Sequence, residues 1–255
     1  MSLVNGTLLF LAAMLAGTMN SVAGGGSFIS FPTLIFTGVL PIPANATSTV
    51  ALWPGSVASI GAYWKKLPRG SRLLLPLTLV SIVGGLLGAL ILLRTSQQTF
   101  MQLVPYLFLV ATLLFTFGKK ISLKLGGLVK SSGPPSWTTI TGAALVQLLI
   151  AVYGGFFGGG IGILMLALLA MVRMEDIHSM NAVKSLLAAA INGSAVVTFI
   201  LAGAVLWPQA ILMVGGAILG GYGGARLAQK LNPKLVRGFV ITVGFSMTAY
   251  FLLRR

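Results

Sequence analysis

Ten apolar segments follow one another along the 255 residues of the chain. Most of them reach or approach the roughly 18–20 residues that an apolar helix needs to cross a bilayer. None alternates apolar and polar residues over about 10 positions, as the strands of a membrane β-barrel do. The pattern therefore predicts an all-α, polytopic transmembrane protein. The predicted segments are 4–22, 27–38, 43–63, 71–93 and 98–117 in the first half, and 138–156, 160–172, 178–202, 207–229 and 235–253 in the second.

The second segment of each half is too short to span a bilayer comfortably, and a glycine-rich run precedes it. These runs are "NSVAGGGSFIS" at 20–30 and "VYGGFFGGGIGIL" at 152–164. Glycine lets the backbone leave helical geometry. Irregular backbone at membrane depth is tolerated only where it is buried in protein or lines a cavity. We expect broken or re-entrant helices at both runs, and leave open whether 4–22 and 27–38 are full spans or a re-entrant hairpin.

The two halves match each other at a constant offset of 136 residues. Such self-similarity at a fixed offset indicates an internal repeat. We expect a transmembrane repeat at 1–117 and another at 137–255, joined by a basic cytoplasmic linker at 118–136. The matched pairs include Gly24 with Gly160, Asn45 with Asn181, Thr49 with Ser185, and Gly84-Gly85 with Gly220-Gly221.

Composition and charge agree with this interpretation. Hydrophobic residues make up 56% of the chain and charged residues only 7%, against roughly 25% charged in soluble domains. The net charge of +15 does not require a nucleic-acid partner, because membrane proteins concentrate Lys and Arg in cytoplasmic loops. The chain has no cysteine, which excludes disulfides and thiolate metal sites. We expect no nucleic acid, metal or cofactor.

The distribution of basic residues favours two inverted repeats. If all five segments of each repeat reverse direction, thirteen basic residues fall on one side of the membrane and three on the other. If the first two segments merge into one span, the division becomes ten to six. The positive-inside rule favours the first arrangement. It places both termini outside and makes the repeats inverted with respect to each other.

Inverted repeats with interrupted helices are typical of secondary transporters, whose substrate sites lie near the midplane at the breaks. Backbone N–H groups freed at a helix start carry partial positive charge and suit an anion. The alternative is that the glycines only permit close helix packing, which is our interpretation of Gly84-xxx-Gly88 and Gly216-xxx-Gly220-xxx-Gly224. The predicted substrate-binding backbone comprises Gly24, Gly25, Gly26 and Ser27 in the first repeat, and Gly158, Gly159, Gly160 and Gly162 in the second.

Lys184 is the only basic residue that lies well inside an apolar segment, away from its ends. It lies about 10 Å beyond Ile177 at 1.5 Å per residue. A lysine at the membrane centre costs on the order of 3 kcal/mol, so its presence suggests a function. We expect it to attract an anion or to carry a coupling proton, unless it snorkels toward the headgroups.

Small polar residues lie close to Lys184 in the repeat pattern. Neutral donors of this kind can bind an oxyanion without adding charge. The alternative for the two asparagines is that they cap their helices. The candidate ligands are Asn45, Ser48 and Thr49 in the first repeat and Asn181 and Ser185 in the second.

Glu175 and Asp176 are the only acids of the chain, and His178 is the only histidine. They stand at the start of a predicted helix on the cytoplasmic side. The simplest interpretation is negative charge that complements the helix dipole, and the alternative is a proton gate. They make a poor catalytic set, and the chain contains no HExxH motif. We therefore do not expect an enzyme.

The paired runs "AGGGSFISFP" and "GGFFGGGIGIL", each followed by "ANATS" or "NAVKS", resemble the TauE/SafE sulfite exporter family, also called sulfonate uptake permeases. The resemblance covers nearly the whole chain. It implies a multi-pass permease of a prokaryotic cytoplasmic membrane that carries sulfite, sulfoacetate or other organosulfonates. Family members that use informative cysteines differ from this chain, which has none.

Together these features predict a secondary-active permease that works by alternating access and is proton-coupled. A passive anion channel is the first alternative, and a membrane-embedded enzyme acting on an anionic substrate is the second. The expected partners are the lipid bilayer and a small sulfur anion. A homodimer, the exact anion, the direction of transport and the coupling ion are left open.

Overall fold

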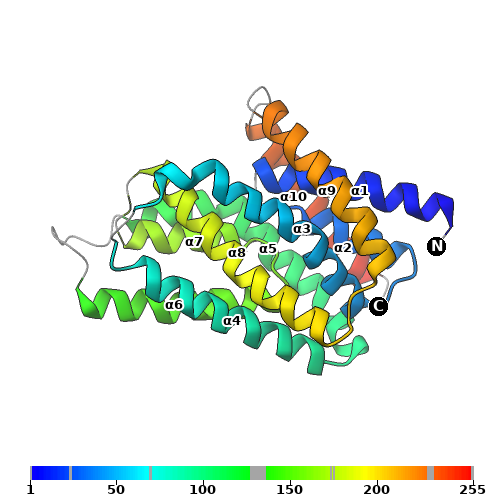
Figure 1. Ribbon diagram of the computed structural model, residues 1–255, viewed down its shortest axis with the longest axis horizontal. Coiled ribbons are helices and arrows are strands. Elements are labelled where there is room, and N and C mark those ends of the chain that lie inside the picture. Colours follow the sequence, from blue (N-terminus) through cyan, green and yellow to red (C-terminus); the bar gives the residue numbers. More distant parts are fainter. Residues whose placement is uncertain are drawn as a thin grey trace.

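The computed structural model describes residues 2–22, 25–68, 71–126, 136–172, 174, 176–228 and 233–253. Every regular element in these ranges is a helix, so the all-α prediction is confirmed (Figure 1). The helices are α1 (Leu3–Val22), α2 (Ser27–Phe36), α3 (Pro41–Tyr63), η1 (Trp64–Lys66), α4 (Leu74–Arg94), α5 (Gln97–Gly126), α6 (Trp137–Phe156), α7 (Ile161–Met171), α8 (Ile177–Leu201), α9 (Trp207–Ala228) and α10 (Pro233–Leu253).

Hydropathy located the α-helices to within three residues at both ends, with one exception. The exception is α5, which continues to Gly126 instead of ending at 117. The added segment "GKKISLKLG" is basic and contains no proline, and Gly118, its one glycine before Gly126, costs a helix only about 1 kcal/mol, so the helix continues through it. The loss of apolar character marks the expected end of the membrane segment and not the end of the helix.

Two helix starts lie earlier than the asparagines that were candidates for caps. Helix α3 begins at Pro41, whose fixed φ and missing N–H suit the first helical position. Helix α8 begins after Asp176, whose side chain accepts hydrogen bonds from the first turn. Asn45 and Asn181 therefore lie inside their helices, and the capping alternative for them is wrong.

Five helical stretches in the described residues are long and apolar enough to cross a membrane. Three shorter apolar helices accompany them: Ser27–Phe36, Ile161–Met171 and Gly238–Leu253. The two shortest are the second helices of the two halves, as expected. The candidate spans are Leu3–Asn20, Leu74–Arg94, Gln97–Gly118, Trp137–Phe156 and His178–Leu201.

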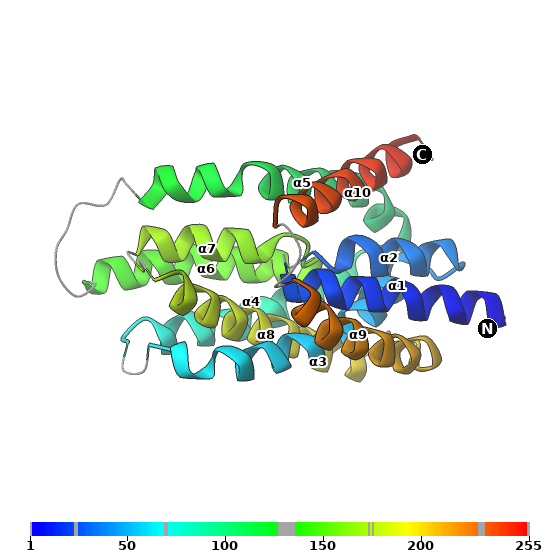
Figure 2. The same cartoon turned by 90° about the horizontal axis from the view of Figure 1, so that it is seen from above.

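Helices α1 and α2 form one hairpin, and α6 and α7 form another (Figure 2). The two hairpins start at opposite ends of the molecule, and each chain reverses direction near the middle (Figures 1 and 2). Both turns coincide with the glycine-rich runs. The start of α1 and the end of α10 lie toward the same end of the molecule, and α6 starts at the opposite end (Figure 2).

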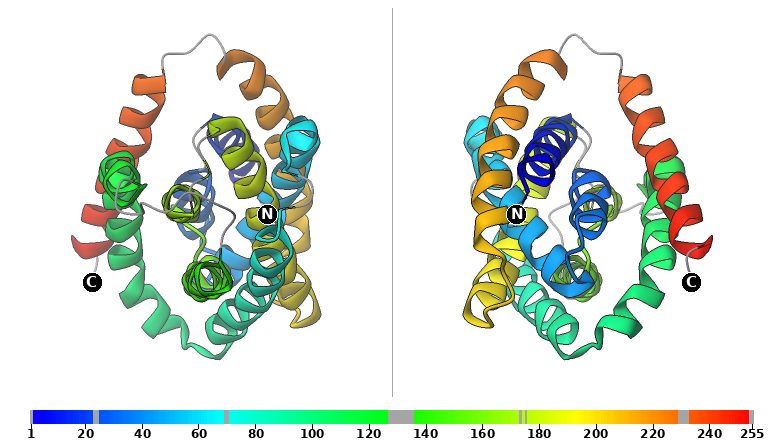
Figure 3. Two further views of the ribbon diagram at one scale, coloured as in Figure 1. Left: turned by 90° about the vertical axis from the view of Figure 1, so that its left-hand side faces the viewer. Right: turned by 90° about the vertical axis from the view of Figure 1, so that its right-hand side faces the viewer.

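The hairpins form a central layer between two outer groups of helices (Figure 3). On one side α5 packs against α10. On the other side α4, α8, α3 and α9 form a row in which each helix contacts the next. The breaks in the hairpins are therefore enclosed by helices on both sides.

The contacts between the halves are reciprocal. Helix α1 packs on α9, and α6 packs on α4, so each first helix contacts the fourth helix of the other half. The third helices, α3 and α8, pack on each other, and so do the fifth helices, α5 and α10. Two repeats related by a two-fold axis would produce this pattern. It supports the inverted-repeat prediction, and the inverted orientation itself stays a prediction.

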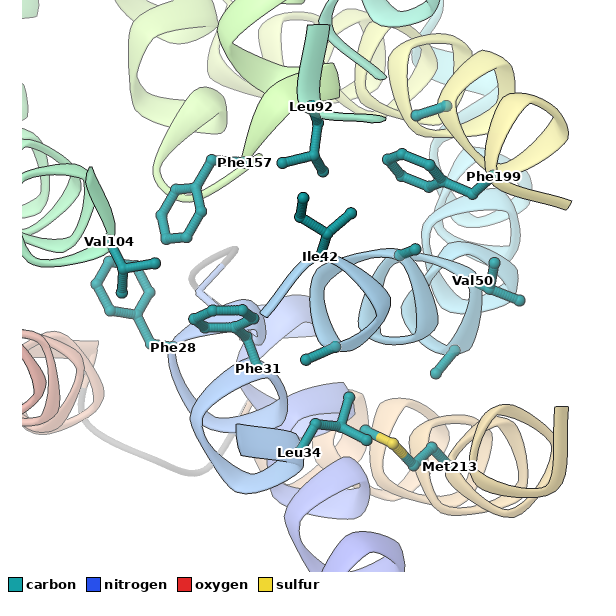
Figure 4. Close-up of a cluster of buried hydrophobic side chains, with 14 of the residues drawn as sticks. Phe28, Phe31, Leu34, Ile42, Val50, Leu92, Val104, Phe157, Phe199 and Met213 are labelled. Atoms are coloured by element: carbon teal, nitrogen blue, oxygen red, sulfur yellow. The ribbon is translucent and has the colours of Figure 1, made fainter. Parts of the chain in front are cut away.

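A cluster of phenylalanines joins the tips of the two hairpins (Figure 4). The ring of Phe108 in α5 lies 5.2 Å from that of Phe28 in α2 and 5.4 Å from that of Phe157, the residue directly after α6. Phe31 completes the group, 6.1 Å from Phe157. Edge-to-face aromatic pairs at such distances contribute about 0.5–1.5 kcal/mol each beyond the area that they bury. The cluster fixes the two breaks relative to each other.

Glycines permit the closest helix crossings, as their spacing predicted. A Cβ on Gly88 in α4 would collide with the Val152 carbonyl oxygen of α6, and one on Gly220 in α9 would collide with the Met14 carbonyl oxygen of α1. Gly84 and Gly216 lie in the same two crossings. Lipid tails are as apolar as the helices, so close van der Waals packing of this kind drives association inside a membrane.

We expect Gly88→Ala to lower the thermal unfolding temperature of the detergent-solubilised protein. The new methyl group would lie 2.7 Å from the Phe156 nitrogen as well as against Val152, and overpacking of this kind costs about 1–3 kcal/mol. The control is Gly142→Ala in α6, where a Cβ would meet nothing within 4 Å. An equal unfolding temperature for the two variants would contradict the close crossing.

Candidate functional site

The break between α6 and α7 requires glycine at two positions for conformational reasons. Gly158 has a φ of +82° and Gly160 a φ of +77°, in the left-handed region that other residues rarely adopt. Gly160 is the residue before α7, so its conformation sets the direction of that helix. The hydroxyl of Tyr153 donates a hydrogen bond to the Gly159 carbonyl oxygen at 2.8 Å and holds the turn from inside.

Other glycines of the two runs are needed because the backbone approaches its neighbours closely. A Cβ on Gly159 would lie 2.8 Å from the ring of Phe157, and one on Gly26 would lie 2.5 Å from the Ala16 carbonyl oxygen. A Cβ on Gly25 would lie 3.1 Å from the side chain of Val240 in α10. Gly24 lies outside the described residues. The glycines thus serve both chain reversal and packing.

The break between α1 and α2 is held by side chains of its own hairpin. The Asn20 side-chain oxygen accepts a hydrogen bond from the Gly26 N–H at 3.1 Å, just before α2 begins at the half-buried Ser27. The Ser30 hydroxyl donates to the Gly26 carbonyl oxygen at 3.2 Å. Asn20 and Ser30 were missed as functional candidates. For Asn20, the available signal was a short polar residue directly before the glycine run.

The polar residues of α3 connect the two hairpins. The Asn45 amide, only 3% exposed, donates to the carbonyl oxygen of Phe156, the last residue of α6, at 3.2 Å. The hydroxyls of Ser48 and Ser30 share a 2.6 Å hydrogen bond between α3 and α2. Thr49 donates to the Asn45 carbonyl oxygen at 2.8 Å. Asn45 and Ser48 thus tie the two break regions to α3, whereas the Thr49 bond lies within α3.

The polar residues of α8 surround the start of α7. The Lys184 ammonium donates to the Asn181 side-chain oxygen at 3.0 Å, which uses one of its three donors. Its aliphatic stem passes Gly162, where a Cβ would lie 3.4 Å from the lysine Cδ. Ser185 is buried beside it. The structure therefore brings the Asn181–Lys184 pair of α8 beside Gly162 in the first turn of α7.

Exposure along α8 is graded. Asn181, Lys184, Ala188 and Asn192 lie along one stripe of the helix and are all half-buried, whereas exposed Val197 lies on the opposite face. Farther along the stripe, Ala195 is fully buried. The polar stripe is therefore partly exposed in the first part of α8 and buried beyond Asn192.

Asp176 caps α8. Its carboxylate accepts hydrogen bonds from the His178 N–H at 3.2 Å, from the Ser179 N–H at 3.1 Å and from the Ser179 hydroxyl at 2.7 Å. The Ser179 hydroxyl and these backbone bonds lower the pKa of Asp176 below its ordinary 3.8. The interpretation as N-terminal helix charge is confirmed for Asp176. His178 is on the same turn, and Glu175 lies outside the described residues.

The described residues of this site supply hydrogen-bonding groups and one positive charge. Among the described residues, no group of three or more His, Cys, Asp or Glu side chains could hold a metal ion. Asp176 is the one acid in the described part of the chain, and it is occupied with its cap. The described site offers a cation, amide and hydroxyl groups, and the start of a helix.

Known proteins resemble this chain over nearly its whole length. A probable membrane transporter protein of Haemophilus influenzae is 25% identical over 95% of this chain and 92% of its own length. A probable membrane transporter protein of a Sinorhizobium species is 30% identical over 94% and 89%. The probable membrane transporter protein YfcA of Escherichia coli K12 is 29% identical over 96% and 88%.

The family model of the sulfite exporter TauE/SafE matches residues 9–251. This range covers both hairpin turns, the row of outer helices and all the described candidate ligands. The relatives named above are membrane transporters by description, in agreement with the helical membrane architecture. The chain therefore belongs to the TauE/SafE sulfite exporter family.

Proposed function

We propose that this protein is a secondary-active permease for small sulfur-containing anions in the cytoplasmic membrane of a prokaryote. Sulfite, sulfoacetate and other organosulfonates are the substrate class, and transport is proton-coupled by alternating access. The observation that carries the proposal is Lys184, held by a neutral partner beside the first turn of α7. The family supplies the substrate class.

The surroundings of Lys184 favour a bound anion. Its hydrogen-bond partner Asn181 is neutral, and Asp176 lies eight residues earlier, about 12 Å along the helix axis at 1.5 Å per residue. The start of α7 adds the partial positive charge of its first N–H groups. Away from bulk water such attractions are stronger, because the local dielectric constant is lower. A small oxyanion would complete this site.

The other predicted ligands have different roles in the proposed site. Gly158, Gly159 and Gly160 set the direction of α7, and Gly25, Gly26 and Ser27 do the same for α2. Asn45 and Ser48 hold the two breaks against α3 through the hydrogen bonds already described, and Thr49 donates to the Asn45 carbonyl oxygen within α3. Ser185 supports the stripe next to Lys184. The anion lies on the second-repeat side, and the first repeat encloses it.

The proposed orientation places both termini outside and the start of α8 in the cytoplasm. Exposed Lys65, Lys66 and Arg72 lie in and just after η1, between α3 and α4. This turn is at the end of the molecule where α8 begins (Figure 2). The positive-inside rule assigns such a basic end to the cytoplasm.

A gated permease fits the described exposure better than a passive channel does. The accessible stripe of α8 ends at Asn192, and Ala195 and Phe199 beyond it are fully buried. An open channel would need accessible side chains along the whole length of the pathway. The same observation favours an opening on the cytoplasmic side in this conformation.

The first test is sulfite flux into proteoliposomes, with and without an imposed pH gradient. We expect saturable flux in the parent and a loss of about tenfold or more in Lys184→Ala, because the main positive charge of the site is removed. Lys65→Ala, which removes an exposed lysine, is the control. Unchanged affinity in a folded Lys184→Ala protein would mean that Lys184 only snorkels and that the anion binds elsewhere.

One substitution distinguishes the two candidate roles of Asp176, capping of α8 and proton gating. Asparagine is an equally good N-cap but does not titrate, so Asp176→Asn keeps the cap and removes the proton site. Because its pKa is lowered in the folded state, the carboxylate stabilises the fold above its unfolded pKa of 3.8, and this stabilisation is lost as the pH falls through the folded pKa.

We expect the unfolding temperature of the parent to fall more steeply below about pH 4 than that of Asp176→Asn. We also expect the two proteins to share the same dependence of flux on pH. A flattened flux profile in Asp176→Asn, with the fold intact, would instead assign the proton gate to this residue.

A further inference from the structure

Helices α3 and α8 carry equivalent stripes in different environments. On α8, Asn181, Lys184 and Ala188 are half-buried. The positions 136 residues earlier on α3 are buried: Asn45, Ser48 and Leu52 are 3%, 2% and 6% exposed. The two helices start at opposite ends of the molecule (Figure 2). The stripe is thus partly exposed along the first part of α8 and buried along the first part of α3.

One hydrogen bond lies beside the two-fold axis that would relate the two stripes. The indole N–H of Trp53 donates to the Ala189 carbonyl oxygen at 3.1 Å, and the two residues are 136 positions apart. This separation equals the offset between the repeats. In a two-fold arrangement a residue can contact its own equivalent only beside the axis. Trp53 therefore lies where α3 and α8 cross, at the centre of the proposed movement.

Position 193 provides the space for the indole ring. A Cβ on Gly193 would lie 3.2 Å from the Trp53 ring nitrogen and 3.3 Å from its Cζ2. Ala189 and Gly193, four residues apart on α8, form a notch that the ring fills. The equivalent of Trp53 is Ala189, which has neither a ring nor a side-chain donor. The contact consequently exists once and has no counterpart in the other direction.

We propose that Trp53 is a latch that favours the conformation open toward the start of α8. If the two repeats exchange conformations during transport, the stripe of α8 closes and that of α3 opens. The exchanged state cannot regenerate the contact, because alanine would then stand where the indole ring stands now. The latch rests on the alternating access of the proposed function, and its test needs no knowledge of the substrate.

Because the chain contains no cysteine, single introduced cysteines can be labelled without background from native thiols. Ala188→Cys reports on the stripe of α8, and Leu52→Cys reports on the equivalent stripe of α3. Each is labelled in proteoliposomes with a membrane-impermeant maleimide, applied from one side at a time. Ser136→Cys and Ser96→Cys, both at exposed positions next to opposite ends of the helical bundle, calibrate the two sides.

In the otherwise unchanged chain we expect Ala188→Cys to be labelled at least about tenfold faster from the cytoplasmic side than from outside. We expect Leu52→Cys to be labelled slowly from both sides, because its position is closed. Adding Trp53→Phe keeps a ring but loses the donor. We expect this change to slow the labelling at position 188 and to speed that at position 52 from outside, each by about threefold or more, since the hydrogen bond to the Ala189 carbonyl oxygen is lost. Gly193→Ala, which pushes on the ring, should act in the same direction.

The control is Trp207→Phe, which alters an exposed tryptophan at the start of α9 and should leave both labelling rates unchanged. Unchanged rates at positions 188 and 52 in folded Trp53→Phe would overturn the latch. If position 188 instead reacts equally from both sides without Trp53→Phe, the protein is a channel, and both the latch and alternating access fail. Absence of sulfite flux together with the expected labelling pattern would leave the latch intact and reject only the substrate.

Discussion

The structure depends on satisfying backbone polar groups where two helices are interrupted inside an apolar protein. Unpaired N–H and C=O groups are costly away from water, so a break at this depth needs partners from within the fold. Asn20 supplies one for the Gly26 N–H, Tyr153 one for the Gly159 carbonyl, and Asn45 one for the Phe156 carbonyl. Because the Asn45 bond runs from α3 to α6, the second break is completed only when the two halves have assembled.

The glycine-rich runs combine requirements that a sequence pattern cannot separate. At Gly158 and Gly160 the backbone conformation itself excludes other residues, whereas at Gly26 and Gly159 it is the proximity of neighbouring atoms. Gly162 serves a third purpose, since it leaves room for the stem of Lys184. The sequence alone left two alternatives for these glycines, a role in substrate binding or a role in close helix packing. In the structure the same run is compatible with both, because a helix that restarts inside a membrane must also pack tightly to hide its backbone.

The sequence predicted the helices well and their partners poorly. Hydropathy follows local composition, so it located α2 and α7 although both are short. It placed the end of α5 too early, because α5 continues as a helix through basic residues after its apolar part ends. The 136-residue offset grouped Ser48 with Lys184, but the Ser48 hydroxyl pairs with that of Ser30. This pairing depends on the packing of α3 against α2, which the sequence does not reveal. Asn20, Tyr153 and Trp53 were missed for the same reason: their partners are set by the hairpin turns and by the crossing of α3 with α8.

The repeat also explains why only one of the two equivalent positions, 48 and 184, carries a lysine. Ser48, the equivalent of Lys184, is closed in against Ser30, and a lysine there would be a buried charge without a partner. In the proposed cycle Lys184 must enter that kind of environment when α8 closes. A bare ammonium would oppose the closure, whereas an ammonium beside an anion, or one that has given up its proton, would not. The same residue would then link movement of the repeats to the presence of the substrate or to release of a proton, so that the empty, charged carrier stays open.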